Sequence, residues 1–214
     1  LAHAMKKGRF PGWQEEVGGD HHSWVVRIMP YLDMQEQSRL GIYKHDPIFY
    51  CPSNPPEATG DTNLALSYRA NVGSDGVFVD LGRDSSASPV GLENIRDGKR
   101  NTLLLAESAI HLSNSSVPGW GPDPDRRTNT DLGFLYESSN STGATNLNKV
   151  DNNTSGAASS FHQEGFNVAY CDGHTDFFYF PAVLESTGAT PEDEDRYKTY
   201  KYSMTRSNAA DETN

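Results

Sequence analysis

Long apolar stretches are missing from this sequence. Only 35% of its 214 residues are hydrophobic, and it contains no apolar run of about 18 residues, the length that a membrane-spanning helix needs. Glycine is frequent, and proline, serine, asparagine, aspartate and threonine accompany it. This composition favours many short strands and long surface loops, and it argues against a helical bundle.

Positive charge is also scarce. The chain has 18 Lys and Arg residues against 29 Asp and Glu residues, which gives a formal net charge of −11. A surface this acidic repels phosphate backbones, so the sequence argues against nucleic-acid binding. The acidic surplus suits calcium binding or plain solubility, and solubility is the commoner reason for it.

Cysteine is rarer still, with only Cys51 and Cys171 present. The two are too far apart for a zinc knuckle or a C-x-x-C redox pair. A disulfide between them would require an oxidising compartment. On the residues alone, a disulfide and two buried free thiols both remain open.

The remaining residues predict short elements separated by loops. Residues 1–7 have good helix formers and two lysines before Gly8, which is typical of a helix C-terminus. Further elements are a helix over 23–40 divided at Pro30, a strand over 47–51, a strand around 66–70, a turn at Asp97 and Gly98, and a buried strand or short helix over 102–106. Residues 113–160 read as a long, loop-rich insertion.

The segment from Phe161 to Phe178, FHQEGFNVAYCDGHTDFF, concentrates the polar chemistry of the chain. Asp172 and Gly173 stand between two β-rich runs, which predicts a hairpin with a two-residue type I′ turn. Tyr170 would then lie opposite Thr175. The turn explains Asp172 and Gly173 without any chemistry.

His162 is the residue that this turn does not explain. We expect it to fix the loop before the strand by bonding Glu107 or nearby backbone. A metal site is the sharper alternative, with His162 and His174 joined by further ligands such as Glu107. A hydrolase built on Glu107, His162 and Asp172 is a third reading, but it lacks an identifiable nucleophile. No G-x-S-x-G, HExxH or P-loop motif is present.

One further loop is rich in oxygen ligands. Four residues within a short stretch could contact a hard cation such as calcium, namely Asp123, Asp125, Asn129 and Asp131. The loop lacks the glycine and terminal glutamate of an EF-hand, so a solvated acidic loop is the more ordinary reading. A calcium- or glycan-binding extracellular module is therefore an alternative function. Glycan binding through Trp13 or Trp120 has no distinctive support.

Six segments in order resemble one family. His162, nine residues, and then Asp172-Gly173 resemble the H-X9-DG signature of the prepilin-type processing-associated proteins, bacterial proteins with a domain of unknown function that are often recorded as pseudopilin-like or type II secretion proteins. The other matching blocks are GRFPGW (8–13), SWVVRIMPYLDMQ (23–35), FYCPSNP (49–55), SYRANVG (67–73) and IRDGKRNTLLLAES (95–108). Asn54 and Arg100 depart from the usual Asp and Ser.

The resemblance implies an α+β, pilin-like fold, in which an N-terminal helix packs on an antiparallel sheet. The head would be one domain over 1–214, and most of the helix would precede Leu1. It further implies a structural or assembly protein rather than an enzyme, extracytoplasmic in location and anchored in the inner membrane before assembly. Its partners would be copies of itself or related subunits. The implied compartment favours a Cys51–Cys171 disulfide. No cofactor is implied, and calcium is the one candidate ligand.

Overall fold

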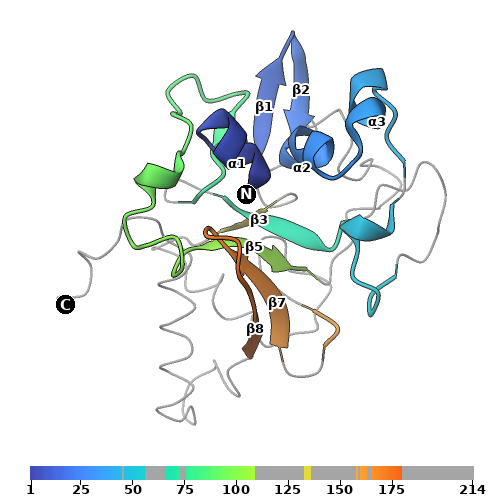
Figure 1. Cartoon of the computed structure of the whole chain (residues 1–214), viewed down its shortest axis with the longest axis vertical. Coiled ribbons are helices and arrows are strands. Elements are labelled where there is room, and N and C mark those ends of the chain that lie inside the picture. Colours follow the sequence, from blue (N-terminus) through green and yellow to red (C-terminus); the bar gives the residue numbers. More distant parts are fainter. Residues whose placement is uncertain are drawn as a thin grey trace.

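The computed structural model describes residues 1–44, 46–55, 66–72, 76–108, 158, 160–162 and 165–179, and the backbone of 133–135. Short helices and two sheets form an α+β fold (Figure 1). The helical elements are α1 (Ala2–Lys7), α2 (Trp24–Ile28), η1 (Met29–Tyr31), α3 (Gln35–Leu40), η2 (Pro47–Phe49) and η3 (Leu92–Asn94). The strands are β1 (Gln14–Val17), β2 (Asp20–Ser23), β3 (Tyr68–Val72), β4 (Asp80–Leu81), β5 (Leu103–Glu107), β6 (Gly133–Leu135), β7 (Gly165–Tyr170) and β8 (Thr175–Tyr179).

The larger sheet has five strands in the order β6-β3-β5-β7-β8. Its β3–β5, β5–β7 and β7–β8 pairs are antiparallel, and β6 pairs with β3 in parallel. The smaller sheet has the order β2-β1-β4. Figure 1 shows α1, α2, α3 and the β1–β2 hairpin gathered above the larger sheet. A helical layer therefore covers one side of that sheet.

The helix ends follow the sequence prediction. Helix α1 stops at Gly8, which adopts φ 71° as a left-handed cap. The predicted break at Pro30 is present, because α2 gives way there to the 3-10 turn η1. None of the helices in the described part of the chain combines the length and apolar content needed to cross a bilayer.

The strand predicted over 47–51 is wrong. Pro47 starts a 3-10 turn there, since its fixed φ suits the first helical position. The Asp46 side chain accepts a hydrogen bond from the Ile48 backbone N–H at 3.0 Å, which caps that turn.

The turn at Asp97 and Gly98 is confirmed, with Gly98 at φ 92°. Strand β5 follows this turn, so residues 102–106, for which a strand and a short helix were both open, form a strand.

One hydrophobic core fills the space between the helical layer and the larger sheet. Phe78 lies at its centre, with its ring 5.8 Å from that of Trp24 and 6.1 Å from that of Phe10. Ala70 and Val72 of β3 and Leu104 of β5 belong to the same cluster. The apolar face of the sheet is therefore buried largely by residues from the first half of the chain.

Strands β7 and β8 pair in a register that differs by one residue from the predicted one. Ala169 pairs with Thr175, so Tyr170 lies opposite His174 and their rings stack 4.2 Å apart. The connection comprises residues 171–173, and only Gly173, at φ 95°, has a positive φ within it. A three-residue loop needs one left-handed residue at its end, whereas the predicted type I′ turn needs two. The predicted type I′ turn, with Tyr170 opposite Thr175, was therefore wrong.

Glu15 is the charged residue most deeply embedded in the helical layer. Its carboxylate pairs with Arg9, and its Oε2 accepts a hydrogen bond from Arg27 Nε at 2.7 Å. Burial opposes ionisation of this carboxylate, but the hydrogen bonds and charges of the two arginines outweigh burial, and the pKa of Glu15 is lowered. The charged form therefore stabilises the fold above the pKa of the unfolded chain, and this contribution is lost as the pH falls through the lowered folded value.

Replacing Glu15 with glutamine should reduce the free energy of unfolding at pH 6 by about 2 kcal/mol, the scale of hydrogen bonds to a charged group. Urea unfolding at pH 6 and pH 3.5 should show a smaller acid-induced loss in Glu15→Gln than in the wild type. The control is Glu36→Gln, which removes a carboxylate from an exposed pair with Arg39. That control should keep the wild-type midpoint. Equal acid sensitivity of wild type and Glu15→Gln would contradict the prediction.

Candidate functional site

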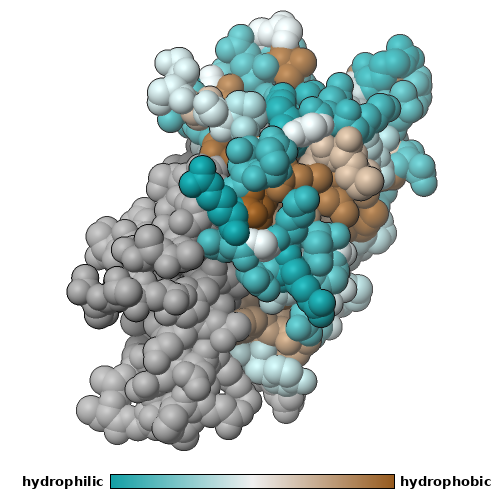
Figure 2. Space-filling view, turned by 60° about the vertical axis from the view of Figure 1, so that its left-hand side comes forward, coloured by the Kyte–Doolittle hydropathy of each residue, from teal (hydrophilic) through white to brown (hydrophobic). Residues whose placement is uncertain are grey.

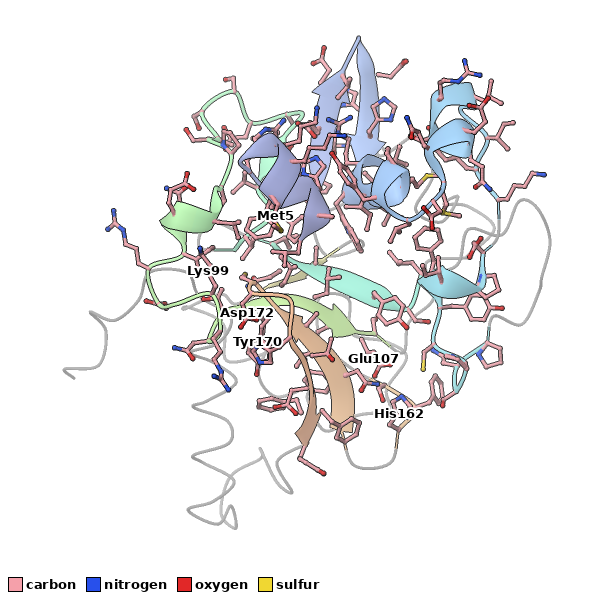
Figure 3. All side chains as sticks on the ribbon, viewed as in Figure 1. Met5, Lys99, Glu107, His162, Tyr170 and Asp172 are labelled. Atoms are coloured by element: carbon pink, nitrogen blue, oxygen red, sulfur yellow. The ribbon has the colours of Figure 1, made fainter. Side chains whose placement is uncertain are left out.

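Three side chains from distant segments meet at one end of the larger sheet. Cys51 follows η2, Glu107 is the last residue of β5, and His162 precedes β7. Their Sγ, carboxylate oxygen and ring nitrogen all lie within 4.8 Å of one another. Cys51 and Glu107 are buried, and the His162 side chain is 29% exposed. Figure 3 shows Glu107 and His162 side by side beyond this end of the sheet.

The contacts in this cluster converge on one ring nitrogen. Nε2 of His162 lies 3.5 Å from Sγ of Cys51 and 3.4 Å from Oε1 of Glu107. The second carboxylate oxygen, Oε2, accepts a hydrogen bond from the Asn167 backbone N–H at 2.7 Å. Glu107 is thus held by β7 through one oxygen and faces the cluster with the other.

Backbone pairing brings these segments together. The Ser67 N–H donates to the Phe49 carbonyl at 2.8 Å, which places the chain leading to Cys51 beside the start of β3. Tyr68 is the cross-strand partner of Glu107 in the β3–β5 ladder. The sheet therefore sets the distance between the Cys51 and Glu107 segments.

A separate set of contacts holds His162. Its backbone N–H donates to Ser160 Oγ at 2.7 Å, and that hydroxyl donates to the Gly165 carbonyl at 2.8 Å. The ring also packs edge-on against Phe177, with the centroids 6.1 Å apart. The imidazole is therefore oriented by the loop and the hairpin together.

The surroundings of the cluster disfavour ionisation of its thiol. Burial raises the pKa of the Cys51 thiol, and the Glu107 carboxylate raises it further, while hydrogen bonding to Ser53 opposes the change. Burial likewise raises the pKa of Tyr68, with Glu107 and Cys51 adding to the effect. Burial and the neighbouring carboxylate therefore both favour the neutral form of the Cys51 thiol.

This geometry does not suit nucleophilic catalysis. A catalytic Cys–His–acid arrangement uses one ring nitrogen for the thiol and the other for the carboxylate. In this cluster both Cys51 and Glu107 approach the same nitrogen of His162. A reactive cysteine also needs a lowered pKa, and the pKa of Cys51 is raised.

A family model described as a protein of unknown function, DUF1559, matches residues 1–180. The match covers most of the chain. The chain belongs to the DUF1559 family. Neither the curated proteins nor the solved structures contain a match to it. All three residues of the cluster lie within the part of the DUF1559 chain that the family model covers.

The expected approach of His162 to Glu107 is confirmed as a contact, with 3.4 Å between Nε2 and Oε1. The hydrolase constellation is wrong. Asp172 of the DUF1559 chain lies at the opposite end of β7, where its Oδ1 is 2.5 Å from His174 Nδ1. Figure 3 shows Asp172 and Tyr170 at one end of the hairpin and His162 at the other. His162 and His174 therefore cannot share a metal ion either.

The predicted disulfide between Cys51 and Cys171 is also wrong. Both cysteines are buried free thiols. The Cys171 backbone N–H donates to Thr102, just before β5 begins, whereas Cys51 lies beside Glu107, where β5 ends. The length of β5 separates the two sulfur atoms, which is more than a disulfide spans.

Two points complete the comparison with the predicted site residues. The calcium candidates Asp123, Asp125, Asn129 and Asp131 lie outside the described residues. The sequence did not predict the meeting of Cys51 with His162, because it offered Cys51 only as half of a disulfide or as a buried free thiol. The available signal was that Cys51, Glu107 and His162 each stand in a different block of the family resemblance.

Proposed function

We propose that this DUF1559 protein is a non-enzymatic, extracytoplasmic structural subunit that assembles, in the manner of pilins, with copies of itself or with related subunits. The fold agrees with the class of protein that the sequence resembles, since helices cover one side of a mainly antiparallel sheet. The unsuitability of the Cys51 cluster for nucleophilic catalysis favours a structural role as well.

The observation that carries this proposal is the two-sided character of α1. His3 and Ala4 are buried against the head, with His3 Nδ1 3.1 Å from the Arg9 carbonyl. Met5, by contrast, is 71% exposed and Leu1 41%. The Met5 N–H bonds to the Leu1 carbonyl at 3.0 Å, so the two residues lie one turn apart on the same side of the helix.

This arrangement suits a helix that docks on its own head and also contacts a neighbour. Figure 2 shows apolar residues gathered in the middle of one face of the molecule, with hydrophilic residues around them. Figure 3 shows Met5 on α1, and its side chain is among the most exposed large hydrophobic side chains of the described residues. Exposed apolar side chains surrounded by polar ones are typical of an interaction surface, and α1 contributes Leu1 and Met5. In pilin-like assemblies the subunits pack through their N-terminal helices, and α1 supplies such a face.

Cysteine crosslinking of the full-length protein in its native cells tests the proposal. Met5→Cys, treated with a short bis-maleimide, should give a ladder of crosslinked multimers. The matched control is Ile48→Cys, which is also exposed but lies on η2. The native Cys51 and Cys171 are buried, so background reaction should be low. Monomer alone from both variants, or the same ladder from both, would contradict assembly through α1.

The same Ile48→Cys variant tests the location. A membrane-impermeant maleimide should label it in cells whose outer permeability barrier has been opened but whose inner membrane is intact. Labelling that requires complete lysis would refute an extracytoplasmic position, independently of the crosslinking result.

A further inference from the structure

The Cys51–Glu107–His162 cluster has the composition of a metal site. It offers one sulfur, one imidazole nitrogen and one carboxylate oxygen, all within 4.8 Å of one another. Calcium and magnesium prefer oxygen ligands alone, whereas zinc accepts sulfur, nitrogen and oxygen together. We propose that Cys51, Glu107 and His162 bind one Zn²⁺ ion. The proposal is independent of assembly through α1.

The distances match a tetrahedral zinc centre. Zinc lies about 2.3 Å from sulfur, about 2.05 Å from imidazole nitrogen and about 2.1 Å from carboxylate oxygen, so a tetrahedral angle separates sulfur from nitrogen by about 3.6 Å and nitrogen from oxygen by about 3.4 Å. The corresponding separations are 3.5 Å between Cys51 and His162, and 3.4 Å between His162 and Glu107. Two edges of the coordination polyhedron are therefore already in place.

Hydrogen bonding alone accounts less well for this arrangement. Nε2 of His162 carries at most one hydrogen, and it faces both the Cys51 sulfur and the Glu107 oxygen. The Cys51 thiol carries one further hydrogen and hydrogen-bonds Glu107, so hydrogen bonds account for at most two of the three contacts in the cluster. A single cation between the three atoms satisfies all of them at once.

The surrounding contacts are those of an outer coordination shell. The Asn167 N–H occupies Oε2 of Glu107 and leaves Oε1 directed at the cluster, which prepares the carboxylate to bind through one oxygen. The Ser160 hydroxyl fixes the His162 backbone, and Phe177 fixes the ring. Two of the three ligands are thus oriented by bonds that do not depend on the metal.

Charge and access also fit a zinc ion. A Cys51 thiolate and a Glu107 carboxylate together carry two negative charges, which a divalent cation neutralises in a buried place. Binding displaces the thiol proton to solvent. Because the His162 side chain is 29% exposed, an ion can enter from that side. The three ligands leave a fourth position for water or another donor.

Zinc at this position would join three segments that are distant in sequence. Cys51, Glu107 and His162 belong to the η2 region, to β5 and to the loop before β7. A single ion would therefore close two long loops of the chain, and it would stabilise the folded state because the unfolded chain does not hold its three ligands together.

Zinc binding by the full chain tests this inference directly. The metal-stripped protein, titrated with ZnCl₂ in a calorimeter, should bind one ion per chain, and its melting temperature should rise. Cys51→Ser and His162→Asn should each weaken binding by more than the ~10–100-fold that loss of an outer-shell partner costs. The matched controls are Cys171→Ser and His174→Asn, which change the same residue types at the other end of the hairpin. Both controls should bind zinc as the wild type does.

Cobalt supplies a second readout that does not depend on any variant. Co²⁺ added to the wild type should give the thiolate-to-cobalt charge-transfer absorption of a Cys ligand, and ZnCl₂ should abolish it. Wild-type protein that binds no zinc, or that binds it equally well after Cys51→Ser, would overturn the proposal. Cobalt binding without the charge-transfer band would overturn it too.

Discussion

Replacing Phe166 with alanine is expected to lower the free energy of unfolding by about 3–5 kcal/mol, the range found when a large aromatic side chain is removed from a packed interior. Phe166 has no exposed surface, and its ring stacks on that of Phe178 at a centroid distance of 5.5 Å. The truncation leaves a cavity beside Phe178 on one face of the sheet, and the hydrogen-bonded backbones of β7 and β8 cannot move to close it. Urea unfolding, followed by tryptophan fluorescence, measures the difference in free energy of unfolding between the wild type and Phe166→Ala.

The matched control for Phe166→Ala is Tyr179→Ala on the neighbouring strand. Tyr179 is 52% exposed, so truncating it removes little buried surface and should cost less than about 1 kcal/mol. Similar losses from the two substitutions would mean that the face of β7 that carries Phe166 is not packed as the structure has it.

The hairpin illustrates how far the sequence carries the fold. The Asp172-Gly173 pair predicted a turn between two strands, and the turn is there, together with the strands on either side. Its register could not be predicted, because Asp-Gly suits both a two-residue type I′ turn and the end of a three-residue turn. The choice depends on contacts that lie outside the turn. The Cys171 N–H bonds to Thr102, and the Asp172 N–H bonds to Lys99.

The 47–51 segment and the cysteines show the same limit. Aromatic and β-branched residues around Phe49 favour a strand, but Pro47 and the Asp46 cap produce a 3-10 turn. Once Cys51 is placed by that turn, it faces Glu107 and His162 and not Cys171. The sequence therefore led us to expect His162 to meet Glu107 or nearby backbone, but not the approach of Cys51, which depends on tertiary packing.

Gly165 links the packing of the hairpin to the candidate zinc site. It pairs with Tyr179 at the end of the β7–β8 ladder. A methyl group on its α-carbon would overlap the Phe178 carbonyl oxygen and lie 2.8 Å from the Phe177 ring. The first of these atoms belongs to the backbone, so the two strands would have to separate. Gly165→Ala should therefore reduce the free energy of unfolding by about 3 kcal/mol.

The substitution should also weaken zinc binding. The Gly165 carbonyl accepts a hydrogen bond from the Ser160 hydroxyl, and that hydroxyl accepts one from the backbone N–H of the zinc ligand His162. The control is Gly41→Ala, where φ is +65° and no atom lies within 4 Å of the added methyl. That change carries only the left-handed backbone penalty of about 1–2 kcal/mol and should leave zinc affinity unchanged. Urea unfolding and zinc titration of both variants separate the two effects.

If Gly165→Ala costs no more stability than Gly41→Ala, the close approach of β8 to Gly165 is refuted. If it is destabilised yet binds zinc as tightly as the wild type, the Ser160 bond does not position His162.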